Sequence, residues 1–223
     1  MLTINRRTVN LLTSARLYLD HLPQNIKLCV RDNSAITAIK SRHYDNSFSY
    51  RFMEALRNYV QHCGLGIHLI TTGSKVLSSE KEGEVEFSFS AFSCKTNLRE
   101  SGNFKKIVLE EMPDNVNIIA ASRSYIDCIR SIHSDVREII HDAVISARAE
   151  IKQAINEHSI LNSGNEEALK IAKIERQENS VKTIEEYYLL LEWDDHRIKL
   201  HEKNRSNGVT SITGIENWYI RSV

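Results

Sequence analysis

A long helical repeat of apolar residues constrains the fold of this 223-residue chain more than any other feature. From Ile118 to Ala143, apolar or small side chains return at alternating intervals of four and three residues, and the same face continues through Ile151 and Ile155. This heptad spacing keeps one side of an α-helix apolar over its whole length. The repeat predicts a helix of about 40 residues, roughly 60 Å long, that packs against other helices or a second copy of the chain.

Two further helices are predicted in the N-terminal part of the chain. The first is capped by Asn5 or Thr8 and ends before Pro23, because proline disrupts a helix interior. The second begins near Asn46 or Ser47 and stops at Gly64. Its apolar residues follow the helical period and form a core stripe, which consists of Phe52, Met53, Leu56, Tyr59, Val60 and Cys63.

A small β insertion is predicted over residues 66–95. Between Val85 and Ala91, apolar and polar side chains alternate, as is typical of a strand with one buried face. After a break at 162–167 we expect a short helix and then a helix from Ser180 to about residue 204. The predicted fold is therefore mainly α: a helical bundle over 1–160 with a β-hairpin insertion, and a helical extension over 161–223 packed on it.

Composition excludes several classes of protein. None of the four cysteines belongs to a CxxC pair, so a structural zinc site is not predicted. There is no signal peptide and no apolar span of about 20 residues, so we expect a cytoplasmic protein without a membrane partner. The net charge is zero.

The charge is unevenly distributed along the chain. Residues 1–75 carry ten basic and four acidic side chains, whereas the remainder carries 19 basic and 25 acidic ones. A basic N-terminal third can attract phosphate. The alternative is that these charges are scattered over solvated faces.

The polar face of the second predicted helix carries the best candidate chemistry. On a helical wheel, Glu54, Asn58 and Gln61 lie opposite the apolar stripe, and Arg57 and His62 flank this polar half on either side. Asn58 and His62 are four residues apart and are therefore neighbours on the helix surface. We call Arg57, Asn58 and His62 the ledge.

These residue types suit cleavage of a phosphodiester. Histidine accepts or donates a proton near neutral pH, and the planar guanidinium of arginine matches phosphate oxygens. RNA supplies its own nucleophile, the 2′-hydroxyl, so this chemistry requires no metal ion and no cofactor. The expected reaction is metal-independent cleavage of RNA.

The ledge also resembles a known motif. The segment Arg57-Asn58-Tyr59-Val60-Gln61-His62 is similar to the Arg-x4-6-His motif of the HEPN superfamily, in which a polar residue commonly follows the arginine. By position, Arg57 and His62 match the catalytic pair and Asn58 the residue that orients it. Glu54, one turn upstream, is a supporting residue outside the motif.

The resemblance implies a helical bundle that forms a homodimer and brings two ledges into one cleft. Many members of the superfamily are metal-independent endoribonucleases of toxin–antitoxin and phage-defence systems. RNA is thus the implied substrate, and an antitoxin or another protein an implied partner.

Four alternatives stay open. The ledge can be an ordinary solvated helix face, or the fold can serve as a non-catalytic dimerisation, interaction or sensor module. A second match to the motif spacing, from Arg16 to His21, lacks the asparagine and ends against Leu22 and Pro23. A more distant alternative is a metal hydrolase that uses His133 and His141, which lack the i, i+4 spacing of a recognised zinc motif.

Overall fold

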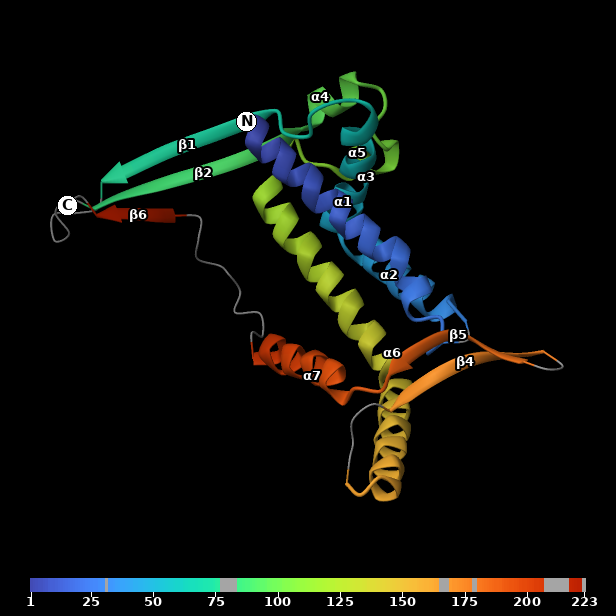
Figure 1. Cartoon of the computed structure of the whole chain (residues 1–223). Coiled ribbons are helices and arrows are strands. Elements are labelled where there is room, and N and C mark those ends of the chain that lie inside the picture. The colour runs from blue at the N-terminus through green and yellow to red at the C-terminus, as the bar shows by residue number, and fades with distance from the viewer. Residues whose placement is uncertain (31, 77–83, 165–168, 178–179, 207–216, 222–223) are drawn as a thin grey trace. The chain divides into compact units, whose positions relative to one another are not determined.

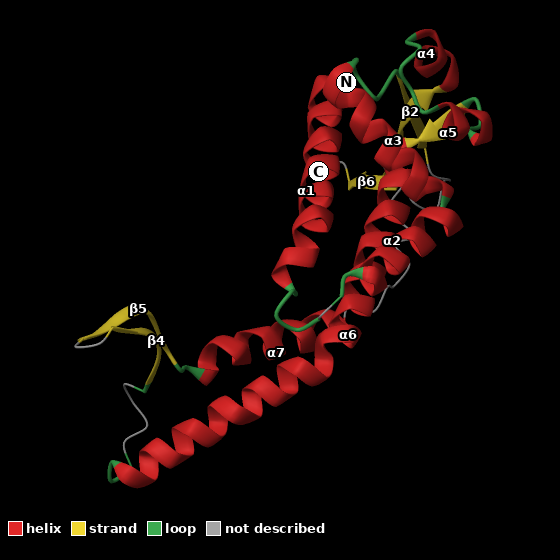
Figure 2. Ribbon diagram, turned by 90° about the vertical axis from the view of Figure 1, so that its right-hand side faces the viewer, coloured by secondary structure: helices red, strands yellow, loops and turns green. Residues whose placement is uncertain are grey.

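The computed structural model describes the chain except for residues 31, 77–83, 165–168, 178–179, 207–216 and 222–223. It is mainly helical with a small antiparallel sheet, which confirms the predicted mainly α class (Figures 1 and 2). The chain divides into two compact units, Met1–Ile139 with Ser211–Val223, and Ile140–Thr210. The division lies within the long helix α6 (Ile118–Leu161).

The first unit contains the helices of the N-terminal part of the chain and the start of the long helix. They are α1 (Leu2–Asn25), α2 (Ser34–Asn46), α3 (Phe48–His62), α4 (Lys95–Glu100), α5 (Lys106–Glu111) and the first part of α6. The predicted long helix is confirmed, with 44 residues. Its stripe is buried at Ile118, Tyr125, Ile132 and Val136, and Ile139 is partly exposed. Among the helices that the structure describes, none combines the length and apolar character needed to cross a membrane.

The first helix departs from the prediction at both ends. It begins at Leu2, before either predicted cap, and Pro23 lies inside its last turn. Asn5 is buried and caps nothing: its Oδ1 accepts a hydrogen bond from the backbone N–H of Ile67 at 3.0 Å, and its Nδ2 donates to the Ile67 carbonyl at 3.4 Å. The Asn5 side chain thus provides hydrogen-bond partners for the buried N–H and C=O groups of Ile67, in the segment that follows α3.

The β insertion is confirmed by a hairpin of β1 (Leu69–Val76) and β2 (Glu84–Cys94). The two strands are antiparallel, with Thr72 opposite Phe89. On its other side β2 pairs with β3 (Asn115–Asn117) and with β6 (Asn217–Arg221) from the C-terminal part of the chain. The strand β2 is therefore the centre of the sheet (Figure 1).

The second unit corrects the prediction for the C-terminal region. Two antiparallel strands, β4 (Lys170–Gln177) and β5 (Ser180–Tyr188), stand where a short helix and the start of a helix at Ser180 were predicted. After α6, the helix that the structure describes in this unit is α7 (Leu191–Ser206). The physical reason is that β5 is rich in β-branched and aromatic residues, which lose side-chain freedom in a helix and fit the surface of a sheet.

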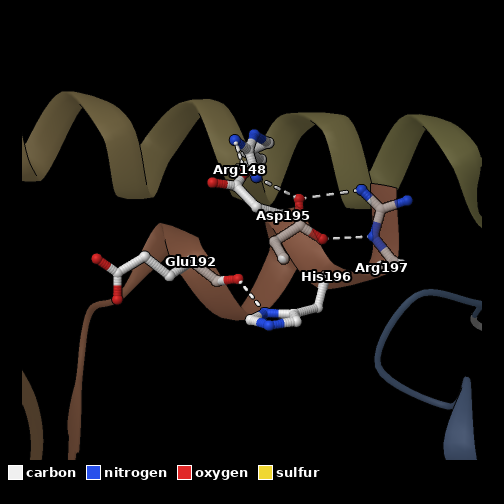
Figure 3. Close-up of polar contacts among 6 residues, drawn as sticks. Arg148, Glu192, Asp195, His196 and Arg197 are labelled. Atoms are coloured by element: carbon white, nitrogen blue, oxygen red, sulfur yellow. Dashed lines mark hydrogen bonds and ion pairs between the residues drawn. The ribbon is translucent and has the colours of Figure 1, made fainter. Parts of the chain in front are cut away.

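Within the second unit, α6 and α7 are joined by an ion-pair cluster. Arg148 on α6 donates to Asp194 at 2.5 Å and to Asp195 at 2.7 Å. Arg197, one turn further along α7, also donates to Asp194. Figure 3 draws Arg148 beside Asp195 and Arg197, and shows His196 donating through Nδ1 to the Glu192 carbonyl, at 2.7 Å. The guanidinium of Arg148 thus spans two carboxylates in a forked geometry.

This cluster makes the packing of α7 on α6 sensitive to acid. Hydrogen bonds from Arg197, and then from Arg148, lower the pKa of Asp194 from 3.8 to about 2. Because the pKa is lower in the folded state, this stabilisation is present above pH 4 and is lost as the pH falls towards 2. We expect Asp194→Asn to remove about 1 kcal/mol at pH 7 and to abolish that pH dependence. The protection of α7 amides from hydrogen exchange, measured between pH 2.5 and 6, reports this stability. If the variant showed the same dependence of protection on pH as the native chain, the role assigned to Asp194 would be contradicted.

Candidate active site

The ledge lies on α3, and local sequence signals hold this helix in place. The hydroxyl of Ser47 accepts a hydrogen bond from the Tyr50 amide at 3.2 Å and caps the first turn, as predicted. Phe52, Met53 and Leu56 are fully buried, which orients the opposite face outward. The stripe ends earlier than predicted, because Cys63 is the exposed residue that follows the helix.

The structure brings two of the three ledge residues into contact. The Nη1 of Arg57 donates to the Oδ1 of Asn58 at 3.0 Å. Asn58 and His62 are exposed, and His62 is the last residue of α3. Arg57 is half-buried, and its Nε atom is buried without a hydrogen-bond partner in the part of the chain that the structure describes. The amide of Asn58 therefore fixes one end of the guanidinium, and within the described residues no hydrogen-bond partner is found for Nη2.

Several arginines of the first unit pair with carboxylates. Arg16 pairs with Asp20 and Glu54, Arg42 with Asp135, and Arg51 with Glu111. Within the described ranges, no carboxylate pairs with Arg57. The described residues therefore provide no carboxylate that neutralises the positive charge of Arg57. An unneutralised positive charge is what a binding site for an anionic group requires. By the same criterion the competing pair of Arg16 and His21 is the weaker candidate.

Glu54 faces away from the role proposed for it. Its Oε1 accepts a hydrogen bond from the Tyr125 hydroxyl at 2.6 Å, and its Oε2 accepts one from Arg16 at 3.2 Å. The carboxylate is directed at α1 and α6, and its side chain is only 15% exposed. Its two donors offset the cost of placing a charge out of water. Glu54 thus links three helices, and its observed contacts are structural.

This network was missed at the level of sequence. The residues Arg16, Glu54 and Tyr125 are far apart along the chain. Each of them fits the helical pattern of its own segment, so the pattern gives no sign that they meet. Burial first, and then the Glu54 charge, raise the pKa of both Tyr125 and Tyr50 well above that of an ordinary tyrosine. Both phenols therefore remain protonated, and Tyr125 remains a hydrogen-bond donor.

The residues considered for metal binding have other surroundings. The Nδ1 of His133 lies 2.8 Å from the Tyr18 hydroxyl, and Asp142 and His141 are exposed. Among the residues that the structure describes, no group of three or more His, Cys, Asp and Glu side chains lies close enough together to hold a metal ion.

Fold and site together define a mainly helical protein with a small antiparallel sheet and an arginine-containing polar ledge on its third helix. No known family, curated protein or solved structure matches the chain.

Proposed function

We propose that this protein is a metal-independent endoribonuclease of the HEPN type, which acts as a toxin or as a component of a defence system. The observation that carries the proposal is the pairing of Arg57 with Asn58, next to the exposed His62, without a carboxylate neutralising Arg57 in the described ranges. An arginine in this state provides positive charge and several N–H donors for phosphate oxygens.

In the proposed reaction the 2′-oxygen of the RNA attacks the adjacent phosphorus, and the bond to the 5′-oxygen of the next nucleotide breaks. A proton leaves the 2′-hydroxyl and another is delivered to the departing oxygen. His62 transfers one of these protons. Arg57 stabilises the charge that develops on the phosphate oxygens, and Asn58 orients the guanidinium. A homodimer would supply a second His62 for the other proton.

Incubation of the purified full-length chain with RNA in excess EDTA tests this function. We expect internal cleavage, with fragments that end in a 2′,3′-cyclic phosphate and fragments that begin with a 5′-hydroxyl, because the attacking group belongs to the substrate. An RNA with deoxyribose at the cleaved position serves as the control and should stay intact. A reaction that requires a divalent metal ion, or fragments with 5′-phosphate ends, would contradict the proposal.

The second candidate is a non-catalytic interaction module of the same fold. It is favoured by the second unit, in which many large apolar side chains are exposed, among them Ile171, Tyr187 and Trp193. Exposed apolar surface of this kind marks interaction sites. An absence of cleavage with every RNA tested would favour this candidate over the enzyme.

A further inference from the structure

The β4–β5 hairpin is more exposed than a stable two-stranded sheet allows. Every residue of β5 is exposed, and on β4 the side chains from Lys170 to Arg176 are exposed as well. Val181 is 63% and Ile174 45% exposed. Hairpins without a further strand or a covering layer are marginally stable in water. The hairpin therefore lacks a partner in the described structure.

The register assigns the side chains of the hairpin to two faces. Cross-strand partners share a face, and faces alternate along each strand. One face carries Ile174 opposite Thr183 at its centre, with the Ala172–Glu186 pair on one side and the Arg176–Val181 pair on the other. On β4, Ile174 is therefore an apolar residue between Ala172 and Arg176 on this face.

The other face carries a checkerboard of charges next to one apolar pair, Ile171 opposite Tyr187. Lys173 lies opposite Glu185, and Glu175 lies opposite Lys182. On β4 the positive Lys173 and the negative Glu175 therefore flank Ile174, and on β5 their partners carry the opposite charges. Such a pattern is complementary to itself after a two-fold rotation.

We propose that the free edge of β4 pairs with β4 of a second copy of this chain, antiparallel about a two-fold axis at Ile174. In this register Ile174 meets its own counterpart at the two-fold axis. On the charged face Lys173 meets Glu175 of the second copy, and Glu175 meets its Lys173. Each row across the resulting four strands then alternates in sign, in the order Glu185, Lys173, the partner's Glu175, the partner's Lys182.

The physical reason for this partner is the combination of an open edge and matched charges. An edge strand presents N–H and C=O groups that another strand can pair. Of the two strands, β4 is the regular one, because the irregularity between Lys173 and Ile174 places the extra residue on β5. A symmetric contact must be complementary to itself. Lys173 and Glu175, on either side of Ile174, meet this condition because they carry opposite charges. The inference does not depend on the proposed ribonuclease activity.

Two double variants of the full-length chain test the register. Lys173→Glu with Glu185→Lys keeps the cross-strand pair within the hairpin but leaves only acidic residues on both sides of Ile174. Glu175→Lys with Lys182→Glu likewise keeps its internal pair but leaves only basic residues there. Each variant alone should form its homodimer with an affinity at least about tenfold lower than that of the native chain, because like charges face each other across the axis. An equimolar mixture should recover association, since acidic and basic β4 strands then meet.

Light scattering and native mass spectrometry measure these outcomes. The native chain should have about twice the 25.6 kDa mass of a single copy. The mixture should form heterodimers in excess of either homodimer, and Ile174→Lys, which places like charges on the axis, should abolish association. Circular dichroism confirms that the variants are folded. A monomeric native chain, undiminished association of either double variant, or a mixture without heterodimers would each overturn the proposal.

Discussion

Replacing Arg57 or His62 by alanine should each lower the rate of RNA cleavage by about 100-fold or more. Arg57→Ala removes the charge that stabilises the transferring phosphate, and His62→Ala removes a proton-transfer group. Both side chains lie outside the buried stripe of α3, so the far-ultraviolet circular dichroism should be unchanged. Single-turnover cleavage of a labelled RNA at saturating enzyme measures the effect on chemistry.

Two matched variants sharpen this prediction. Arg57→Lys keeps the charge but lacks the planar fork, so it should recover only part of the lost rate. His21→Ala removes the exposed histidine of the competing motif and should leave the rate unchanged. Arg16→Ala is an unsuitable control, because it takes a partner from the largely buried Glu54. Cleavage that persists in folded His62→Ala would refute the role assigned to the ledge.

Truncation of Tyr125 should be the most destabilising single change in the first unit. This side chain is fully buried, lies 5.4 Å from the Tyr50 ring between centroids, and donates to Glu54. Tyr125→Ala should lower the free energy of unfolding by about 3–5 kcal/mol, through lost packing and the cavity that remains. Urea denaturation followed by circular dichroism gives the value.

The variant Tyr125→Phe separates the hydrogen bond from the packing. It keeps the ring but takes one donor from the Glu54 carboxylate, and should cost about 1–2 kcal/mol. Ile126→Ala, at a partly exposed neighbour on the same helix, should cost about 1 kcal/mol or less. If Tyr125→Phe were as damaging as Tyr125→Ala, the hydrogen bond and not the packing would dominate.

Local pattern was sufficient for the features that depend on near neighbours. The heptad spacing predicted α6, and the cap at Ser47 with the stripe from Phe52 to Tyr59 predicted α3. Alternation from Val85 to Ala91 predicted the strand β2. These elements are confirmed because amphipathic periodicity reports directly which face of an element is buried. The catalytic role of the ledge stays a prediction.

Tertiary structure decided what the local pattern left open. Glu54 belongs to the polar half of α3 on a helical wheel, yet Arg16 and Tyr125 from two other helices turn it into a largely buried link. Asn5 reads as a helix cap, yet it binds the backbone of Ile67, 62 residues away. The segment from Ser180 was predicted as a helix and is a strand, because its β-branched and aromatic residues pair with the neighbouring strand β4. For Glu54 and Asn5 the deciding partners are distant in sequence. Sequence alone therefore determined the periodic elements, and packing determined which polar groups they bring together.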